Sequence, residues 1–257
     1  MQSGLILFSV LSLGLIAATP VDITKFNQIQ HNEDVAFRNS ILENAILQAL
    51  EGLRKDMVQG TNDIPVLDPL DVEHLELNEE LLTLPGSHVT LKDLVVTKLS
   101  TFVVDTLSVT SETLLPLRYR ITFDIRIPIL VAEADNYDLR IIAQGLNIFG
   151  NGDAKVTLIE PKVHGHLILS PRLTIGSGLY YSITTSNVNF SLKGFDSNIN
   201  GLMNDPGMSE FINTFLKHFV PDAVVVYHDD ITKILSETVM EVGNELLKDL
   251  NLGSILG

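Results

Sequence analysis

The clearest pattern in the chain is a long alternation of apolar and polar residues between Tyr119 and Ile129. Because neighbouring side chains of a strand point to opposite faces, this alternation predicts a strand with one buried face and one solvated face. The buried face would form a broad apolar wall, which the rest of the chain has to cover. Its members are Tyr119, Ile121, Phe123, Ile125, Ile127 and Ile129.

Two segments with helical spacing of apolar residues, one near each end of the chain, are expected to cover that wall. The first covers residues 32–57 and stops before Gly60. The second covers residues 209–250, and Pro221 is expected to kink or divide it. The second segment opens with an apolar stripe of Phe211, Ile212, Phe215, Leu216 and Phe219.

Between the two helical segments, residues 72–192 read almost wholly as strands of an antiparallel meander. The segment Gly150–Asp153 is predicted to be a hairpin connection, because its residues accept positive φ. No linker divides the chain, so residues 19–257 are expected to form a single domain. The expected strands cover residues 89–109 (as one strand or two), 119–129, 139–149, 154–159, 163–169 and 179–192.

Residues 1–18 resemble a secretory signal peptide. They carry no charged side chain, contain a short apolar stretch over 5–16 and end in small residues. The stretch is short for a membrane span, although a membrane anchor is the alternative interpretation. No later segment is long and apolar enough to cross a bilayer, so we expect a secreted, extracellular protein without stable membrane insertion.

Composition narrows the classes of function. The apolar fraction of 45% excludes disorder. A formal net charge of -15 argues against nucleic acid as a partner. The chain has no cysteine, which excludes disulfides, a thiol nucleophile and thiolate metal sites. No cofactor is expected.

The sequence contains none of the common catalytic or phosphate-binding motifs, so we predict no catalytic residues and no enzyme activity. The Ser177 segment, Gly176–Gly178, precedes a strand and lacks the strand-to-helix elbow of a hydrolase nucleophile. His164 and His166 could share a metal ion on one face of a strand, but no third ligand is near in sequence. We therefore predict no metal site, with both histidines facing solvent opposite Val163, Gly165 and Leu167.

One modification site is predicted. Asn189 opens the glycosylation sequon Asn189-Phe190-Ser191. The alternation places Val188, Phe190 and Leu192 inward, so Asn189 is expected to face solvent and to carry a glycan.

Several segments, in their order and spacing, resemble the insect haemolymph juvenile hormone binding protein family, including the takeout-like proteins. The resemblance covers most of the mature chain. It implies an α+β fold in which a strongly curved antiparallel sheet wraps a long helix and encloses an elongated hydrophobic tunnel. This architecture is similar to the lipid-binding modules of bactericidal permeability-increasing proteins. The matching segments are Phe37–Ser40, Ile64–Leu70, Leu117–Tyr119, Gly145–Gly152 and the C-terminal helix after Leu202–Asn204.

The chain departs from the family pattern at one point. Family members usually carry two N-terminal cysteines that attach the first helix, and Ser40 stands where the second is expected. The N-terminal arm is therefore expected to be looser, and a gating role of that disulfide does not transfer.

The resemblance implies an extracellular carrier that binds a juvenile-hormone-like terpenoid, a fatty acid or a related lipid in the tunnel. We expect a monomer, whose partners are the hydrophobic ligand and possible receptors that the sequence does not identify. Alternatives are a surfactant or surface-lipid-binding protein that acts at an interface, and a hydrolase acting on the ligand. The expected ligand-binding residues are Phe37, Ile41, Phe102, Val104, Tyr119, Ile121, Phe123, Ile125, Ile127, Leu167, Leu169, Tyr181, Phe211, Phe215, Val224 and Tyr227.

Overall fold

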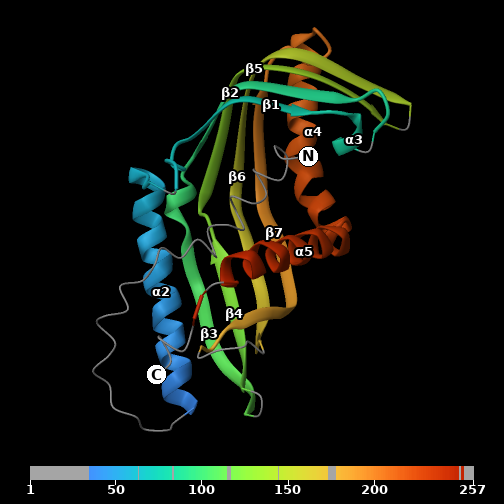
Figure 1. The fold of residues 1–257 in the computed structure, drawn as a ribbon. Coiled ribbons are helices and arrows are strands. Elements are labelled where there is room, and N and C mark those ends of the chain that lie inside the picture. The colour runs from blue at the N-terminus through green and yellow to red at the C-terminus, as the bar shows by residue number, and fades with distance from the viewer. Residues whose placement is uncertain are drawn as a thin grey trace.

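A computed structural model describes residues 35–62, 64–82, 84–114, 117–143, 145–172, 178–248 and 250–251. The predicted signal peptide, the Gly176-Ser177 pair and the side chain of Phe37 lie outside this description. Over the described ranges the chain is an α+β protein in which an antiparallel sheet packs against helices (Figure 1). The helical elements are α2 (Val35–Gln59), α3 (Glu79–Leu82), η2 (Leu99–Thr101), α4 (Pro206–Val226) and α5 (His228–Leu247).

Strand β6 organises the sheet. Its first half pairs with β5 and its second half with β4, while β7 follows its other edge over most of its length. β2 then pairs with β5, β1 with β2, and β3 with β4, all antiparallel. Within the described residues, the edges of the sheet are therefore β7 on one side and β1 and β3 on the other. The strands are β1 (Leu70–Leu77), β2 (His88–Thr97), β3 (Val103–Leu114), β4 (Leu117–Arg126), β5 (Ile129–Ala143), β6 (Leu146–Pro171) and β7 (Tyr181–Ile199).

The long alternation predicted as one strand is divided between two strands. β4 ends at Arg126, and β5 begins at Ile129. Pro128 lies between them, and its missing N–H cannot continue the β4 ladder. The predicted alternation is confirmed over β4, since Tyr119, Ile121 and Phe123 are all buried. The prediction that Ile129 lies on the buried face is wrong, because its side chain is 40% exposed at the start of β5.

The predicted hairpin at Gly150–Asp153 is wrong. These residues lie inside β6, and the reversal from β5 to β6 occurs around Gly145 instead. The glycines serve close packing rather than a turn. A Cβ atom on Gly150 would lie 2.7 Å from the carbonyl oxygen of Gly201, which no side chain tolerates. Strands predicted separately over 154–159 and 163–169 are likewise parts of the continuous β6.

The helices lie along the two edges of the sheet. α2 packs against β3 and η2, whereas α4 and α5 pack against β7 (Figure 1). The expectation that Pro221 divides the C-terminal helix is wrong, because α4 continues to Val226 and the division falls at Tyr227. One missing hydrogen bond at Pro221 is tolerated in a helix that is also held by β7. α4 begins cleanly, because the Asp205 carboxylate accepts from the N–H of Met208 at 2.8 Å.

The apolar core has three clusters that share partly buried members. The first joins α2 and α5 to β3, β4, β6 and β7. The second joins the later turns of α2 to β1, β2, η2 and β5. The third, small cluster centres on Tyr137, Leu202 and Ile212 of α4. Ile46 packs on the first two clusters and Leu91 on the last two, so the core runs from one end of the sheet to the other.

Candidate functional site

Helix α4 has two kinds of apolar side chain on different sides. Ile212 and Leu216 face the sheet and belong to the third cluster. Phe211, Phe215 and Phe219 continue the stripe away from the sheet. Phe211 lies about 100° around the helix from Ile212, whereas Phe219, seven residues after Ile212, borders the buried face. The stripe seen in the sequence is thus wide enough to supply a buried face and a second apolar face.

The second face of α4 is not covered by the described part of the chain. The side chains of Phe211, Phe215 and Phe219 are 65%, 51% and 47% exposed. Phe215 and Phe219 stack on each other, with ring centroids 4.9 Å apart and ring planes 20° apart. Met208, one turn before Phe211, extends this surface. We call Met208, Phe211, Phe215 and Phe219 the phenylalanine row.

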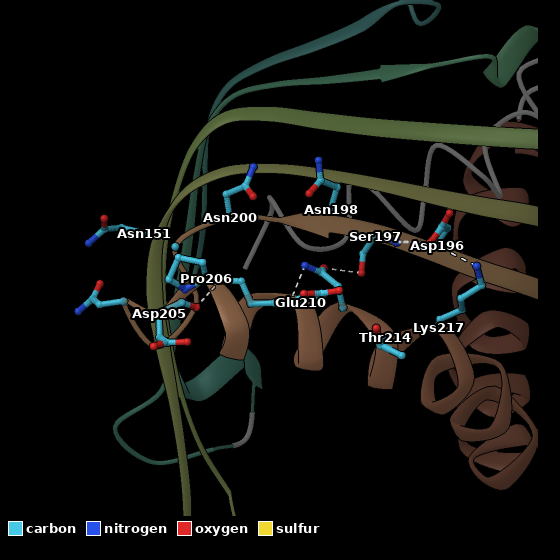
Figure 2. Close-up of a pocket in the computed structure, with 14 residues that line it drawn as sticks. Asn151, Asp196, Ser197, Asn198, Asn200, Asp205, Pro206, Glu210, Thr214 and Lys217 are labelled. Atoms are coloured by element: carbon cyan, nitrogen blue, oxygen red, sulfur yellow. Dashed lines mark hydrogen bonds and ion pairs between the residues drawn. The ribbon is translucent and has the colours of Figure 1, made fainter.

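The other flank of α4 borders a polar groove of approximately 780 Å³. Its walls are the first turns of α4 and the end of β7, and Figure 2 shows the lining side chains. The Lys217 ammonium lies 3.8 Å from the Asp196 carboxylate and links the two walls. The lining residues are Asn151, Asp196, Ser197, Asn198, Asn200, Gly201, Asn204, Asp205, Pro206, Ser209, Glu210, Asn213, Thr214 and Lys217.

The polar groups at the base of the groove are already hydrogen-bonded to one another. The Asn213 carboxamide oxygen accepts from Ser197 Oγ and from the N–H of Ile199, and its nitrogen donates to the carbonyls of Ile199 and Ser209. This amide therefore fixes α4 to β7. The groove is a polar seam between helix and strand, and it is not the apolar tunnel expected from the sequence.

Close to this seam, Tyr137 is fully buried, and its hydroxyl donates to the carbonyl of Asn200 at 2.6 Å. Burial, with smaller contributions from the Asp153 and Asp138 carboxylates, raises the pKa of Tyr137 to about 12. The hydroxyl thus stays protonated and serves as a structural donor.

Most of the predicted ligand-binding residues lie in the packed clusters. The first cluster contains Tyr119, Ile121, Phe123, Leu167, Leu169 and Tyr181, and the rings of Tyr119 and Tyr181 lie 5.6 Å apart. The second contains Phe102 and Ile127, with Val104 and Ile125 packed against it. Ile41 and Val224 are half-buried. The residues in the two clusters face inward as predicted. The inward position of Ile41 and Val224, and the contact of any of these residues with a ligand, stay predictions.

Three predicted ligand-binding residues stand apart from the core. Phe211 and Phe215 belong to the phenylalanine row, and Tyr227 is exposed at the junction of α4 and α5. Phe219 belongs to the predicted stripe but not to the expected ligand-binding residues, and Met208 belongs to neither. The signal was present in the spacing, because Met208, Phe211, Phe215 and Phe219 repeat every three or four residues.

The histidine pair lies on β6 as expected, opposite the inward-facing Val163 and Leu167, but both histidines are half-buried rather than free in solvent. His164 stands between Asp124 of β4 and Asn189 of β7 in the register. Partial burial, and then the Arg120 charge, lower the pKa of His166, so its neutral form is favoured. Among the described residues, no three His, Asp or Glu side chains converge closely enough to hold a metal ion.

The predicted glycosylation site is half-buried rather than free. The Asn189 amide donates to Asn187 at 2.9 Å, and its oxygen accepts from the Thr232 hydroxyl of α5 at 3.2 Å. Val188 and Phe190 face the core as predicted. A glycan on Asn189 stays a prediction, and because it is attached to the amide nitrogen it would compete with the hydrogen bonds of that nitrogen to Asn187 and to the carbonyl of His164.

Comparison with known proteins assigns the class. The model of the haemolymph juvenile hormone binding protein family matches residues 10–256. The chain belongs to this family, which is a family of binding proteins. No curated protein sequence matches the chain.

One solved structure agrees at the level of the fold. The chain is similar to the crystal structure of Takeout 1 from Epiphyas postvittana, with a TM-score of 0.53 and 18% identity over 86% of this chain and 95% of that one. It is also matched to lipopolysaccharide binding protein, with a TM-score of 0.38 and 12% identity over 83% of this chain and 40% of that one. The first comparison establishes a Takeout-like fold.

No described helix combines the length and the hydropathy that a membrane crossing requires.

Proposed function

We propose that the protein is an extracellular carrier of a small hydrophobic ligand, such as a terpenoid, a fatty acid or a related lipid. The observation that carries the proposal is the uncovered phenylalanine row of α4. Four large apolar side chains in water are unfavourable, and a ligand that covers them recovers that free energy. Membership of a binding-protein family, named for a hormone ligand, supports the same interpretation.

The arrangement of helices supports an enclosed interior. α2 is attached to the β3 edge and α5 to the β7 edge, yet both contribute to the first apolar cluster. Helices from opposite edges thus pack on the same apolar cluster of the sheet. We propose that the sheet curves around this interior and that the ligand extends from the phenylalanine row into a tunnel between helices and sheet.

Apolar burial alone gives a measurable affinity. A ligand that buries on the order of 400 Å² of apolar surface gains roughly 10 kcal/mol. Association costs at least about 4 kcal/mol. The remaining ~6 kcal/mol corresponds to a Kd of about 40 µM, which a few oriented polar contacts would tighten. Tyr119, Tyr181 and Tyr227 are candidates for such contacts.

The test is saturable uptake of a dansyl-labelled fatty acid, with unlabelled terpenoids and fatty acids as competitors. The double variant F211S/F215S removes two apolar anchors from an exposed surface and should weaken binding by about tenfold or more. Because both side chains are largely exposed, the thermal unfolding midpoint should change little.

The matched control is I129S/I159S. Ile129 and Ile159 are partly exposed and are paired between β5 and β6, away from α4. This control should bind the probe as the wild type does. Absence of saturable uptake by the wild type, or equal affinity in F211S/F215S, would contradict the proposal.

A further inference from the structure

The junction of α4 and α5 presents three consecutive apolar side chains to solvent. Val225 and Val226 are each 75% exposed and Tyr227 is 58% exposed, the two valines being the most exposed large apolar side chains of the described residues. Tyr227 ends α4 and begins α5. Figure 1 shows this junction at the margin of the molecule, on the far side from α2. We call Val225, Val226 and Tyr227 the apolar corner.

We propose that the apolar corner docks the protein on the surface of a lipid bilayer that has no net charge. Two valines can enter the boundary between headgroups and acyl chains, where burial of apolar area drives binding. Tyr227 beside them has the amphipathic ring that is enriched at the level of the headgroups.

The charges around the corner select the type of lipid. Asp222, Asp229 and Asp230 flank it, and all three are exposed. His228 lies next to Asp229, with Nδ1 3.1 Å from a carboxylate oxygen. Lys233 is the nearby exposed cation. A cluster of acids on a chain with a net charge of -15 is repelled by anionic headgroups, whereas zwitterionic headgroups impose no such barrier.

A lipid surface fits this corner better than a second copy of the chain. A stable protein interface buries about 800 Å² on each partner. Three side chains at one corner fall well short of that area, and two copies of like charge repel each other. A bilayer, in contrast, is bound by the few side chains that enter it.

The corner continues into the phenylalanine row. Val226 follows Phe219 by seven residues, or two helical turns, so both lie on the same side of α4. A lipid that leaves a bilayer at the corner would meet the phenylalanine row on the same side of the helix, beyond the exposed Asp222. Docking itself needs no bound ligand, so it can be tested separately from ligand binding.

The experiment is co-sedimentation of the ligand-free full chain with phosphatidylcholine vesicles. The variant V225S/V226S should lower the partition coefficient by about tenfold or more. The matched control V58S/V66S changes two exposed valines near the end of α2 and should bind as the wild type does. The single variant Y227S serves if the double variant fails to fold, and it should show a smaller loss.

Vesicles in which part of the phosphatidylcholine is replaced by phosphatidylserine should bind less protein at low salt, and added salt should restore binding. Three results would overturn the proposal: no co-sedimentation of the wild type with phosphatidylcholine, equal binding by V225S/V226S, or equal losses in V225S/V226S and V58S/V66S. A wild-type dimer in solution that V225S/V226S converts to a monomer would assign the corner to self-association and would also overturn it.

Discussion

Single polar side chains attach strands of the sheet to the neighbouring loops and short helix. Asp68, in the Ile64–Leu70 segment, accepts from the N–H groups of Lys98 and Ser100, at 2.8 and 2.9 Å. Its carboxylate thus holds η2 against the start of β1. In the third cluster, Tyr137 holds β5 to the loop after β7, through its hydrogen bond to Asn200.

Tyr137 should make stability depend on pH in the alkaline range. Its pKa in the folded state, about 12, lies above its ordinary value of 10.0. Below pH 10 the hydroxyl is protonated in both states, and its full contribution is present. Between pH 10 and 12 the unfolded state releases the proton first, so stability falls as pH rises.

The free energy of unfolding of the variant Y137F should be about 1 kcal/mol lower than that of the wild type at neutral pH, because the variant lacks a buried hydrogen bond. It should also lose stability less steeply than the wild type between pH 10 and 12. Urea unfolding at a series of pH values measures both effects, with Y180F as the control. Equal slopes for the wild type and Y137F would contradict the account of this residue.

The residue patterns predicted which side chains of a strand face inward better than they predicted where the chain turns between strands. The alternation around Tyr119, Ile121 and Phe123 dictates which side chains are buried, because only one face of that strand can be apolar. The glycines at Gly150 and Gly152 were misread as a turn. A glycine indicates either a positive φ or a close backbone approach. Only the folded positions of Gly201 beside Gly150, and of Asn200 beside Gly152, show that the backbone approaches closely here.

At the scale of elements, the helices take the place of missing neighbour strands at the sheet edges. On β7, Asn244 of α5 bonds both the N–H and the carbonyl of Ile183, at 2.7 and 3.0 Å. Ser236 of α5 accepts from the N–H of Val188. On the β3 edge, the Glu43 carboxylate of α2 accepts from the N–H of Val109 at 3.2 Å. These bonds cover backbone groups that would otherwise be open to pairing with another chain.

The variant N244A should test this role of α5. It leaves both backbone groups of the buried Ile183 without their partner, so we expect a loss of about 1–3 kcal/mol in the free energy of unfolding. Hydrogen exchange at the Ile183 amide should become faster.

The matched control is N198A, which removes an exposed asparagine from the same strand. It should leave unfolding and exchange at Ile183 unchanged. If N244A unfolds with the same free energy as N198A, the helix does not hold the strand through this side chain.

The periodicity of apolar residues predicted where the helices lie, but it did not predict which of their apolar side chains are buried and which are exposed. Residues 32–57 and 209–250 were identified as helical, and α2, α4 and α5 occupy most of these ranges. In α4, Ile212 is buried and Phe211 beside it is exposed. Both are apolar, so only the position of β7 decides which of them packs. The division at Tyr227 rather than Pro221 has the same origin, since packing on β7 compensates for the hydrogen bond that Pro221 lacks.

At the scale of the molecule, the helices of both edges converge on one apolar cluster, and the chain has no disulfide to assist them. The family and the Takeout-like fold were predicted from the order of segments. The tunnel could not be located in the same way. Apolar residues that pack a core and those that line a cavity have the same pattern in a sequence, and sixteen candidates were named without a means to separate them.

Native mass spectrometry of the mature protein, purified from an animal-cell host and followed by organic extraction, tests the central claim most directly. We expect an added mass of one small lipid at near-unit stoichiometry, which extraction releases and identifies by chemical class. A protein that carries no such mass, and that takes up no hydrophobic probe when one is supplied, would contradict the proposal that it is a carrier.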